Sequence, residues 1–212
     1  MNIIVPGLAL APEFYEARFP IARVVDTWCF PWISSCSDAN NFYYDGEPIT
    51  LIGHSLGGLM ALEWALLFPQ NVCRLVLLDP TFPRDNAEYT INNPLANIAT
   101  RLLPLSLAPF FDNSILNRRY RGKQNRQFLA HQWNYASTLE TRVSQLLTAS
   151  TVAPHIRTHV IVGAGNGRQT RFLMEQRTLA SMLDAKLVML WGENHLFPLT
   201  NPELVLPFIS QV

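Results

Sequence analysis

The segment Ile49-Thr50-Leu51-Ile52-Gly53-His54-Ser55-Leu56-Gly57-Gly58 decides the fold of this chain. It fits the pattern G-x-S-x-G, between an apolar run that predicts a buried strand and a stretch, 56–68, with apolar residues at helical spacing. Small residues are needed at 53 and 57, because larger side chains would collide with the neighbouring strand and helix. The tight turn is predicted to expose the Ser55 hydroxyl at the helix amino end, where free N–H groups favour a developing oxyanion.

Apolar runs like the one before Gly53 recur along the chain. They are short, rich in Val, Ile and Leu, and continuous rather than alternating, which is typical of strands covered on both faces. Helical patterns lie between some of them, for example over 171–183. The alternation predicts an α/β fold with a mostly parallel sheet. The predicted strands are 3–5, 22–25, 49–52, 75–78, 159–162 and 186–190.

The alternation stops from about residue 81 to about residue 154. This stretch has several prolines, no strand-like run, and helical patterns over 125–136 and 139–148. A helical block inserted between two strands is expected to lie over the carboxyl edge of the sheet, where open α/β folds bind ligands. The sequence therefore predicts a core of 1–80 and 155–212, and a helical cap, or lid, of 81–154.

The composition excludes several classes of protein. With 212 residues, 49% of them hydrophobic, and 16 basic against 16 acidic side chains, the chain should form a compact soluble protein without a general attraction to nucleic acid. Three cysteines with no CxxC pair favour reduced thiols. We expect a cytoplasmic protein, because no signal-peptide pattern and no run of about 20 apolar residues is present. We also expect a monomer or weak dimer.

A serine nucleophile needs a base, and the chain offers five histidines. Only His195 follows the last strand-like run, on a loop just before a predicted C-terminal helix, and this loop should reach the carboxyl edge near Ser55. The others are less suitable: His54 adjoins the serine but should point elsewhere on the turn, His131 lies in the cap, and His155 and His159 lead into a strand. His195 is the predicted base.

These residues resemble the α/β hydrolases over nearly the whole chain. The resemblance rests on 3–7 as a first strand and loop, 24–26 as the next strand, 53–57 as the elbow, and 194–198 with 201–203 as the histidine loop and last helix. The family usually has two further strands before these. The resemblance implies an α/β-hydrolase sheet of about six strands that lacks the first two.

The acid of the catalytic triad is the main departure from the family pattern. Members usually have Asp after the penultimate strand, where this chain has Asn166, and an amide cannot stabilise a charged imidazole as a carboxylate does. Asp79 ends the strand that follows the elbow, a position from which some family members supply the acid. The hypothesis is a triad of Ser55, His195 and Asp79, although Asp79 in Asp-Pro is also typical of a turn residue.

The loop after the first strand also differs from most members. It reads Pro6-Gly7 where they have His-Gly, but backbone donors need no particular side chain. By the resemblance, the backbone N–H groups of Leu56 and Leu8 are the candidate oxyanion hole.

Charge is unevenly distributed along the chain. Nine of the 16 basic residues and only four acids fall between Arg84 and Arg157, and five of the nine lie within 118–126. Such a run is often a solvated helix face. However, arginine suits phosphate and carboxylate groups, so a basic cap above an acyl-hydrolase site favours coenzyme A or the phosphopantetheine arm of an acyl-carrier protein.

A second, short resemblance points the same way. Residues 127–132, with basic residues before them, look like the cap of esterases that demethylate pimeloyl-carrier-protein methyl ester in biotin synthesis. In that family basic cap residues hold the phosphate arm. The predicted substrate-binding residues are Arg121, Lys123, Arg126 and Phe128, although an aromatic residue at helical spacing is more often part of a core.

The predicted activity is hydrolysis of a carboxylic ester or thioester by a serine enzyme, on a small acyl ester or a carrier-bound acyl chain. No metal or organic cofactor is expected. A serine rather than an aspartate at the elbow argues against dehalogenase and epoxide-hydrolase chemistry. An acyltransferase or a lyase on the same triad remains open. A degenerate hydrolase that serves as a binding protein also remains open, because of Asn166 and Pro6.

Overall fold

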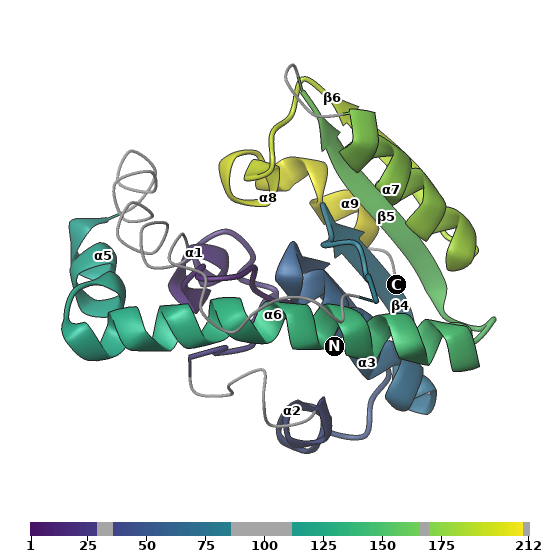
Figure 1. Ribbon diagram of the computed structural model, residues 1–212, viewed down its shortest axis with the longest axis horizontal. Helices are drawn as coiled ribbons and strands as arrows, with labels where there is room; N and C mark the ends of the chain where they lie inside the picture. The colour runs from purple at the N-terminus through teal and green to yellow at the C-terminus, as the bar shows by residue number, and fades with distance from the viewer. Residues whose placement is uncertain (29–35, 86–111, 166–169, 210–212) are drawn as a thin grey trace.

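Six parallel strands form a single sheet in the order β2-β1-β3-β4-β5-β6 (Figure 1). The computed structural model describes residues 1–28, 36–85, 112–165 and 170–209. The α/β class and the six predicted strands are confirmed, each within a few residues of its expected place. The strands are β1 Asn2–Val5, β2 Ala22–Val24, β3 Ile49–His54, β4 Val72–Leu78, β5 Arg157–Ala164 and β6 Lys186–Trp191.

Helices cover both faces of this sheet. One face packs against α2 Cys36–Tyr43, α3 Leu56–Leu67 and α7 Thr170–Met182. The other packs against α1 Pro12–Glu16 and the C-terminal segment, and α5 Asn113–Tyr120 joins the same hydrophobic cluster through Leu116 and Tyr120. A short 3-10 turn, η1 Pro69–Asn71, links α3 to β4. In the described part of the chain, no helix combines the length and the apolarity that crossing a membrane requires.

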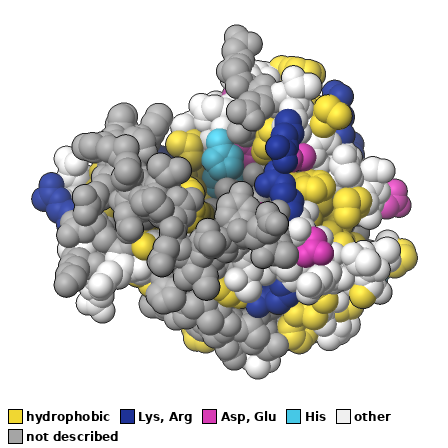
Figure 2. Space-filling model, viewed as in Figure 1, with side chains coloured by type: hydrophobic (Ala, Val, Ile, Leu, Met, Phe, Trp, Pro, Cys, Tyr) yellow, Lys and Arg dark blue, Asp and Glu magenta, His cyan; other side chains and the backbone are white. Residues whose placement is uncertain are grey.

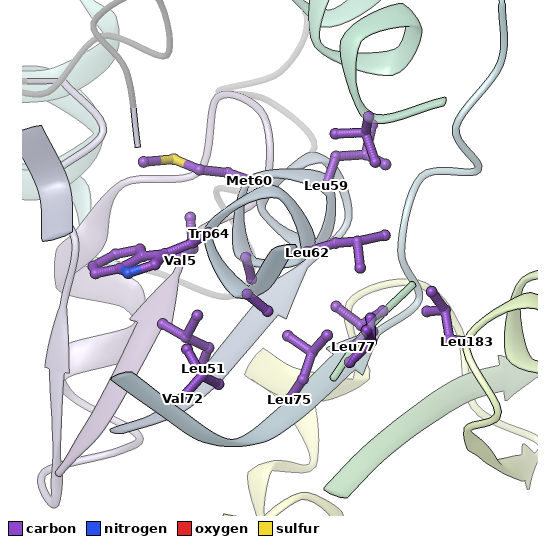
Figure 3. Close-up of a cluster of buried hydrophobic side chains, with 14 of the residues drawn as sticks. Val5, Leu51, Leu59, Met60, Leu62, Trp64, Val72, Leu75, Leu77 and Leu183 are labelled. Carbon is purple, nitrogen blue, oxygen red and sulfur yellow. The ribbon is translucent and has the colours of Figure 1, made fainter. Parts of the chain in front are cut away.

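The helix after the elbow, α3, is the centre of the larger hydrophobic cluster (Figure 3). Its residues are buried from Leu56 to Ala65, because the sheet lies on one side of it and other helices on the remaining sides. A helix that is apolar all round is stable only in such a position. Figure 3 shows Leu59, Leu62 and Trp64 projecting from α3 among side chains of neighbouring elements. The start of α3, and with it the elbow, is therefore fixed firmly to the sheet.

The two helical patterns expected at 125–136 and 139–148 form one helix, α6 Lys123–Ala149, which runs across the molecule in Figure 1. Both patterns are helical, and the helix continues through the intervening Ser137 and Thr138 because these polar residues do not break a helix and no Gly or Pro occurs within α6. Leu139 and Val143 belong to the same cluster as α3. An ion pair between Arg142 and the almost fully buried Glu63 also joins α6 to α3.

The C-terminal segment also differs from the expected single helix. It is divided into α8 Phe197–Thr200, the 3-10 turn η3 Pro202–Leu204 and α9 Leu206–Ile209. Pro202 and Pro207 lack the N–H that a continuous helix would need; Pro202 begins η3, and Pro207 lies in the first turn of α9. Phe197 and Ile209 still bury their side chains against the sheet.

Candidate active site

Ser55 lies between β3 and α3 with φ 55° and ψ −122°, a conformation that residues other than glycine rarely adopt. Three backbone hydrogen bonds of about 3.0 Å hold it: its N–H donates to Leu78, and its carbonyl accepts from Gly58 and Thr81. A Cβ atom on Gly57 would lie 2.3 Å from the carbonyl oxygens of Val5 and Pro6, so only glycine allows α3 to approach β1 this closely. The strained turn is thus maintained by its surroundings.

The structure brings Asp79 and His195 into direct contact. Asp79 follows β4 with φ 44°, and its carboxylate is completely buried. Its Oδ2 accepts a hydrogen bond from His195 Nδ1 at 3.0 Å, and its Oδ1 accepts from the Gly163 N–H at 2.9 Å. The His195 side chain is 41% exposed. With Nδ1–H bound to the carboxylate, Nε2 is the nitrogen that can accept a proton. Asn166, the alternative acid, lies outside the described residues.

Several contacts place this pair beside the elbow. The imidazole of His54, the residue before Ser55, lies 4.8 Å from that of His195 between ring centroids, and its Nε2 is 2.9 Å from the His195 carbonyl oxygen. On the other side, Thr81, two residues after Asp79, donates its N–H to the Ser55 carbonyl. Ser55, Asp79 and His195 therefore share one small region at the carboxyl edge of the sheet.

The loop after β1 lies against Ser55: a Cβ atom on Gly7 would be 3.1 Å from Ser55 Cβ. Within the described structure, the Leu8 N–H is the one N–H of residues 7–11 that has no hydrogen-bond acceptor. The others donate as follows: Gly7 to Tyr15 Oη, Ala9 to Gln132 Oε1, Leu10 to the Gly7 carbonyl and Ala11 to Tyr120 Oη. Leu56 begins α3, where helical N–H groups lack intrahelical acceptors. Among the described residues, neither predicted oxyanion donor has a competing acceptor.

Two side chains of the segment between β4 and β5 hold this loop, and the sequence analysis missed both. Tyr120 of α5 donates its hydroxyl to the Ala9 carbonyl at 2.7 Å and accepts from the Ala11 N–H at 3.0 Å. Gln132 of α6 accepts weakly from the Ala9 N–H at 3.4 Å and donates to the Thr27 carbonyl at 3.1 Å. The sequence around Tyr120 and Gln132 contains no motif that would identify this role, since it depends on contacts with residues more than 100 positions earlier in the chain.

Of the four predicted substrate-binding residues, the structure describes the side chains of Arg121 and Phe128. Arg121 follows α5, which lies at the left end of the molecule in Figure 1, whereas α8, just after His195, is near the middle of the view. The side chain of Arg121 is exposed. The side chains of Lys123 and Arg126 lie outside the described part of the structure. Phe128 stacks on Trp28 at 5.0 Å between ring centroids.

Two other cations of the basic segment are paired with acids of the core. Arg118 contacts Glu13 at 2.6 Å, and Arg119 contacts Glu13 at 2.9 Å and Asp26 at 3.3 Å. Burial alone would lower the pKa of Arg119, but these two carboxylates raise it. Figure 2 shows the Lys and Arg side chains of this face in several separate places, some beside acidic ones.

Among the described residues, no three His, Cys, Asp or Glu side chains gather as metal ligands would.

The arrangement of sheet, elbow and histidine loop defines a known class of protein. Residues 6–208 match the model of the alpha/beta hydrolase family, and the chain belongs to that family. The fold agrees with solved structures. A probable hydrolytic enzyme from Pseudomonas aeruginosa has a TM-score of 0.67 at 18% identity, with 100% of this chain and 85% of that chain covered. A peroxisomal alpha-beta-hydrolase from Saccharomyces cerevisiae has a TM-score of 0.69 at 19% identity, covering 99% and 75%.

The chain also shares a partial sequence match with homoserine O-succinyltransferases. The protein from Ralstonia nicotianae is 31% identical over 85 residues, which are 40% of this chain and 20% of that enzyme. The protein from Neisseria meningitidis is 30% identical over 95 residues, covering 43% and 24%. The match thus spans no more than about a quarter of these relatives.

Proposed function

We propose that the protein is a serine hydrolase that cleaves a carboxylic ester or thioester of an acyl chain. The observation that carries this proposal is the hydrogen bond between the buried Asp79 carboxylate and His195 Nδ1, beside the elbow of Ser55. It supports a triad of Ser55, His195 and Asp79, with the acid supplied after β4. Membership of the alpha/beta hydrolase family supports the same class of chemistry.

In the first half of the reaction, Ser55 Oγ attacks the carbonyl carbon of the substrate while His195 Nε2 takes the hydroxyl proton. Asp79 accepts from Nδ1–H and stabilises the imidazolium that forms. The negative charge on the carbonyl oxygen is stabilised by the N–H groups of Leu8 and Leu56, neither of which has a competing acceptor in the part of the chain that the structure describes. Collapse of the tetrahedral intermediate expels the alcohol or thiol, which takes the proton from His195, and leaves an acyl ester on Ser55.

In the second half, His195 Nε2 takes a proton from water as the water oxygen attacks the acyl carbon. The same N–H groups stabilise the second tetrahedral intermediate. When it collapses, the bond to Ser55 Oγ breaks, the serine regains its proton from His195, and the carboxylic acid leaves. The exposed position of the His195 side chain is compatible with the entry of water.

Labelling by a fluorophosphonate tests this proposal directly, since the reagent reacts with an activated serine. The wild-type protein should be labelled at Ser55 and should hydrolyse short p-nitrophenyl esters. The S55A variant should show neither property, with a loss in kcat of roughly 10^4- to 10^6-fold. A folded wild-type protein that is not labelled would contradict the proposal and favour a binding role.

For the substrate, the finer proposal is an acyl chain on a carrier protein, of the kind used in pimeloyl ester cleavage. It rests on the basic segment 118–126, of which Arg118 and Arg119 are already engaged with core carboxylates. Charge reversal at Arg121, Lys123 and Arg126 should then weaken hydrolysis of carrier-bound substrates and spare p-nitrophenyl esters. Equal loss on both substrates would contradict it.

A second candidate is acyl transfer to an alcohol, favoured by the partial match to homoserine O-succinyltransferases. The acyl group on Ser55 would pass to a hydroxyl group in place of water, through the same triad. The test is to add homoserine or a simple alcohol to an ester assay and measure the products. Formation of the new ester at the expense of the free acid would favour transfer, and an unchanged yield of acid would favour hydrolysis.

A further inference from the structure

His54 is a completely buried histidine whose two ring nitrogens contact helix α1 and the loop that carries His195. Its Nδ1 lies 2.6 Å from Tyr15 Oη, and its Nε2 lies 2.9 Å from the carbonyl oxygen of His195. Tyr15 in turn accepts a hydrogen bond from the Gly7 N–H at 3.2 Å. A continuous chain of hydrogen bonds therefore runs from Gly7 through Tyr15 and His54 to His195.

The partners determine which atoms donate. A carbonyl oxygen only accepts, so the hydrogen between His54 and His195 must be on Nε2 of His54. Charging a completely buried imidazole is costly, so His54 is neutral and Nδ1 is an acceptor. Burial raises the pKa of Tyr15, so the phenol keeps its proton and donates it to Nδ1. Every donor in the chain thus has an acceptor.

The two ends of this chain are the loops that the reaction needs. Gly7 precedes Leu8, whose N–H has no acceptor among the described residues, and a Cβ atom on Gly7 would lie 3.1 Å from Ser55 Cβ. At the other end, the His195 carbonyl belongs to the same residue that contacts Asp79 through its side chain. The imidazole of His54 also packs against that of His195.

We propose that His54 is a positioning residue, which joins the oxyanion loop at Gly7 to the histidine loop at His195 and holds both beside Ser55. The inference rests on the proposed serine-hydrolase function. His54 does not take the proton of Ser55 in this arrangement, because its Nδ1 is occupied by Tyr15 and its Nε2 carries a hydrogen. It acts through the two loops, and Tyr15 is the necessary partner on the oxyanion side.

Kinetics of Y15F and H54A test the link. Y15F keeps the buried ring but removes the hydroxyl that serves Gly7 and His54. Each variant should lower kcat by about 10- to 100-fold with little change in KM, because a small displacement of a reacting group is costly. The double variant should be no slower than H54A alone, because both substitutions break the same chain. H54Q, which places an amide near the position of Nε2, should recover part of the loss seen in H54A.

Tyr43 provides a matched control, since it is also a buried tyrosine whose hydroxyl has two backbone partners, at Asp26 and Val24. Y43F removes a similar hydroxyl on the other face of the sheet and should leave kcat unchanged, even if it lowers the melting temperature as much as Y15F does. Full activity of Y15F or H54A, additive losses in the double variant, or an equal loss in Y43F would overturn the proposal.

A spectroscopic measurement separates this proposal from the proposed function. In uniformly 15N-labelled protein, NMR should show His54 as the neutral form protonated at Nε2, and Y15F should shift the resonances of both Gly7 and His195. A form protonated at Nδ1, a charged ring, or a change confined to the Gly7 loop would overturn the link. The NMR result does not depend on the labelling result. If fluorophosphonate fails to label Ser55 but NMR shows the expected form of His54 and the expected shifts, the proposed function is contradicted and the link is not.

Discussion

The polar side chains at the two edges of the sheet differ in how they are paired. At the carboxyl edge, Asp79 and His195 are bonded to each other, and His54 has a partner on each ring nitrogen. At the amino edge, four basic side chains lie on neighbouring strands: Arg74 of β4, Arg157 and His159 of β5, and Lys186 of β6. No described carboxylate forms an ion pair with any of these four. Two buried nitrogens there, Arg74 Nε and His159 Nδ1, have no described hydrogen-bond partner.

This difference indicates where the fold depends on specific pairs. At the carboxyl edge, loops from three or more strands converge, so that each polar group meets another and the removal of one leaves its partner buried and unpaired. At the amino edge the cations mainly repel one another, since Arg74 and Arg157 are directly opposite in the register. Substitutions should therefore be costly to function at one edge and nearly neutral at the other.

The largest expected effect is at Asp79. D79N keeps the shape of the side chain but removes the charge that stabilises the His195 imidazolium, so kcat for ester hydrolysis should fall by about 10^4-fold. Steady-state kinetics on a p-nitrophenyl ester measure this. Asp26 offers a matched control at the same edge, since it follows β2 and pairs with Arg119. D26N should keep nearly full activity, and equal activity of D79N and D26N would refute the assigned triad.

A much smaller effect is expected at Arg74. Its side chain is almost fully buried, it donates to the Phe208 carbonyl at 3.0 Å, and it faces Arg157. R74M replaces a buried cation by an apolar side chain of similar length, a kind of change that is often neutral or stabilising. Urea unfolding should show a change in stability within about 1 kcal/mol, with kcat unchanged. A loss of several kcal/mol would mean that the amino edge is as dependent on its polar groups as the carboxyl edge.

The smallest effect concerns pH and His159. Burial, followed by the charges of Arg74, Lys186 and Arg157, lowers the pKa of His159. The unfolded chain, with a histidine pKa near 6.5, therefore binds a proton first as the pH falls, and stability decreases below about pH 6.5 until the lowered pKa is reached. H159F keeps the ring contact with Phe208 and removes the titration.

The urea midpoint of H159F should therefore fall less between pH 7.5 and pH 5.5 than that of the wild type. If H159F and the wild type lose the same stability over this range, the proton of His159 is not linked to folding.

The strands and the elbow were predictable because their signals are local. A continuous run of Val, Ile and Leu identified each strand, and the step from β3 to α3 identified the turn at Ser55. The segment after β4 was less predictable. The apolar spacing over 125–148 gave the helical character of α6 but not its continuity. The packing of Leu139 and Val143 against α3 was not visible, because it depends on which face of α6 meets the core.

The candidate site was predictable in its residue types more than in its contacts. The order of Ser55, Asp79 and His195 along the chain and their positions after strands were sufficient to nominate them. The roles of Tyr15, His54, Tyr120 and Gln132 were missed, since each joins segments that are far apart in sequence. The contacts of His54 with Tyr15 and the His195 carbonyl agree with the expectation that it points elsewhere on the turn, but no sequence signal indicated that its ring links these two segments.

The sequence by itself determined the strand and helix pattern, the strained serine between β3 and α3, and a histidine loop after the last strand, because each depends on neighbouring residues and on backbone sterics. The tertiary structure alone decided that Asp79 meets His195, that the Leu8 N–H has no acceptor within residues 1–28, 36–85, 112–165 and 170–209, and that His54 joins the two loops through Tyr15. Such contacts depend on strand order and register, which bring four distant segments to one edge of the sheet.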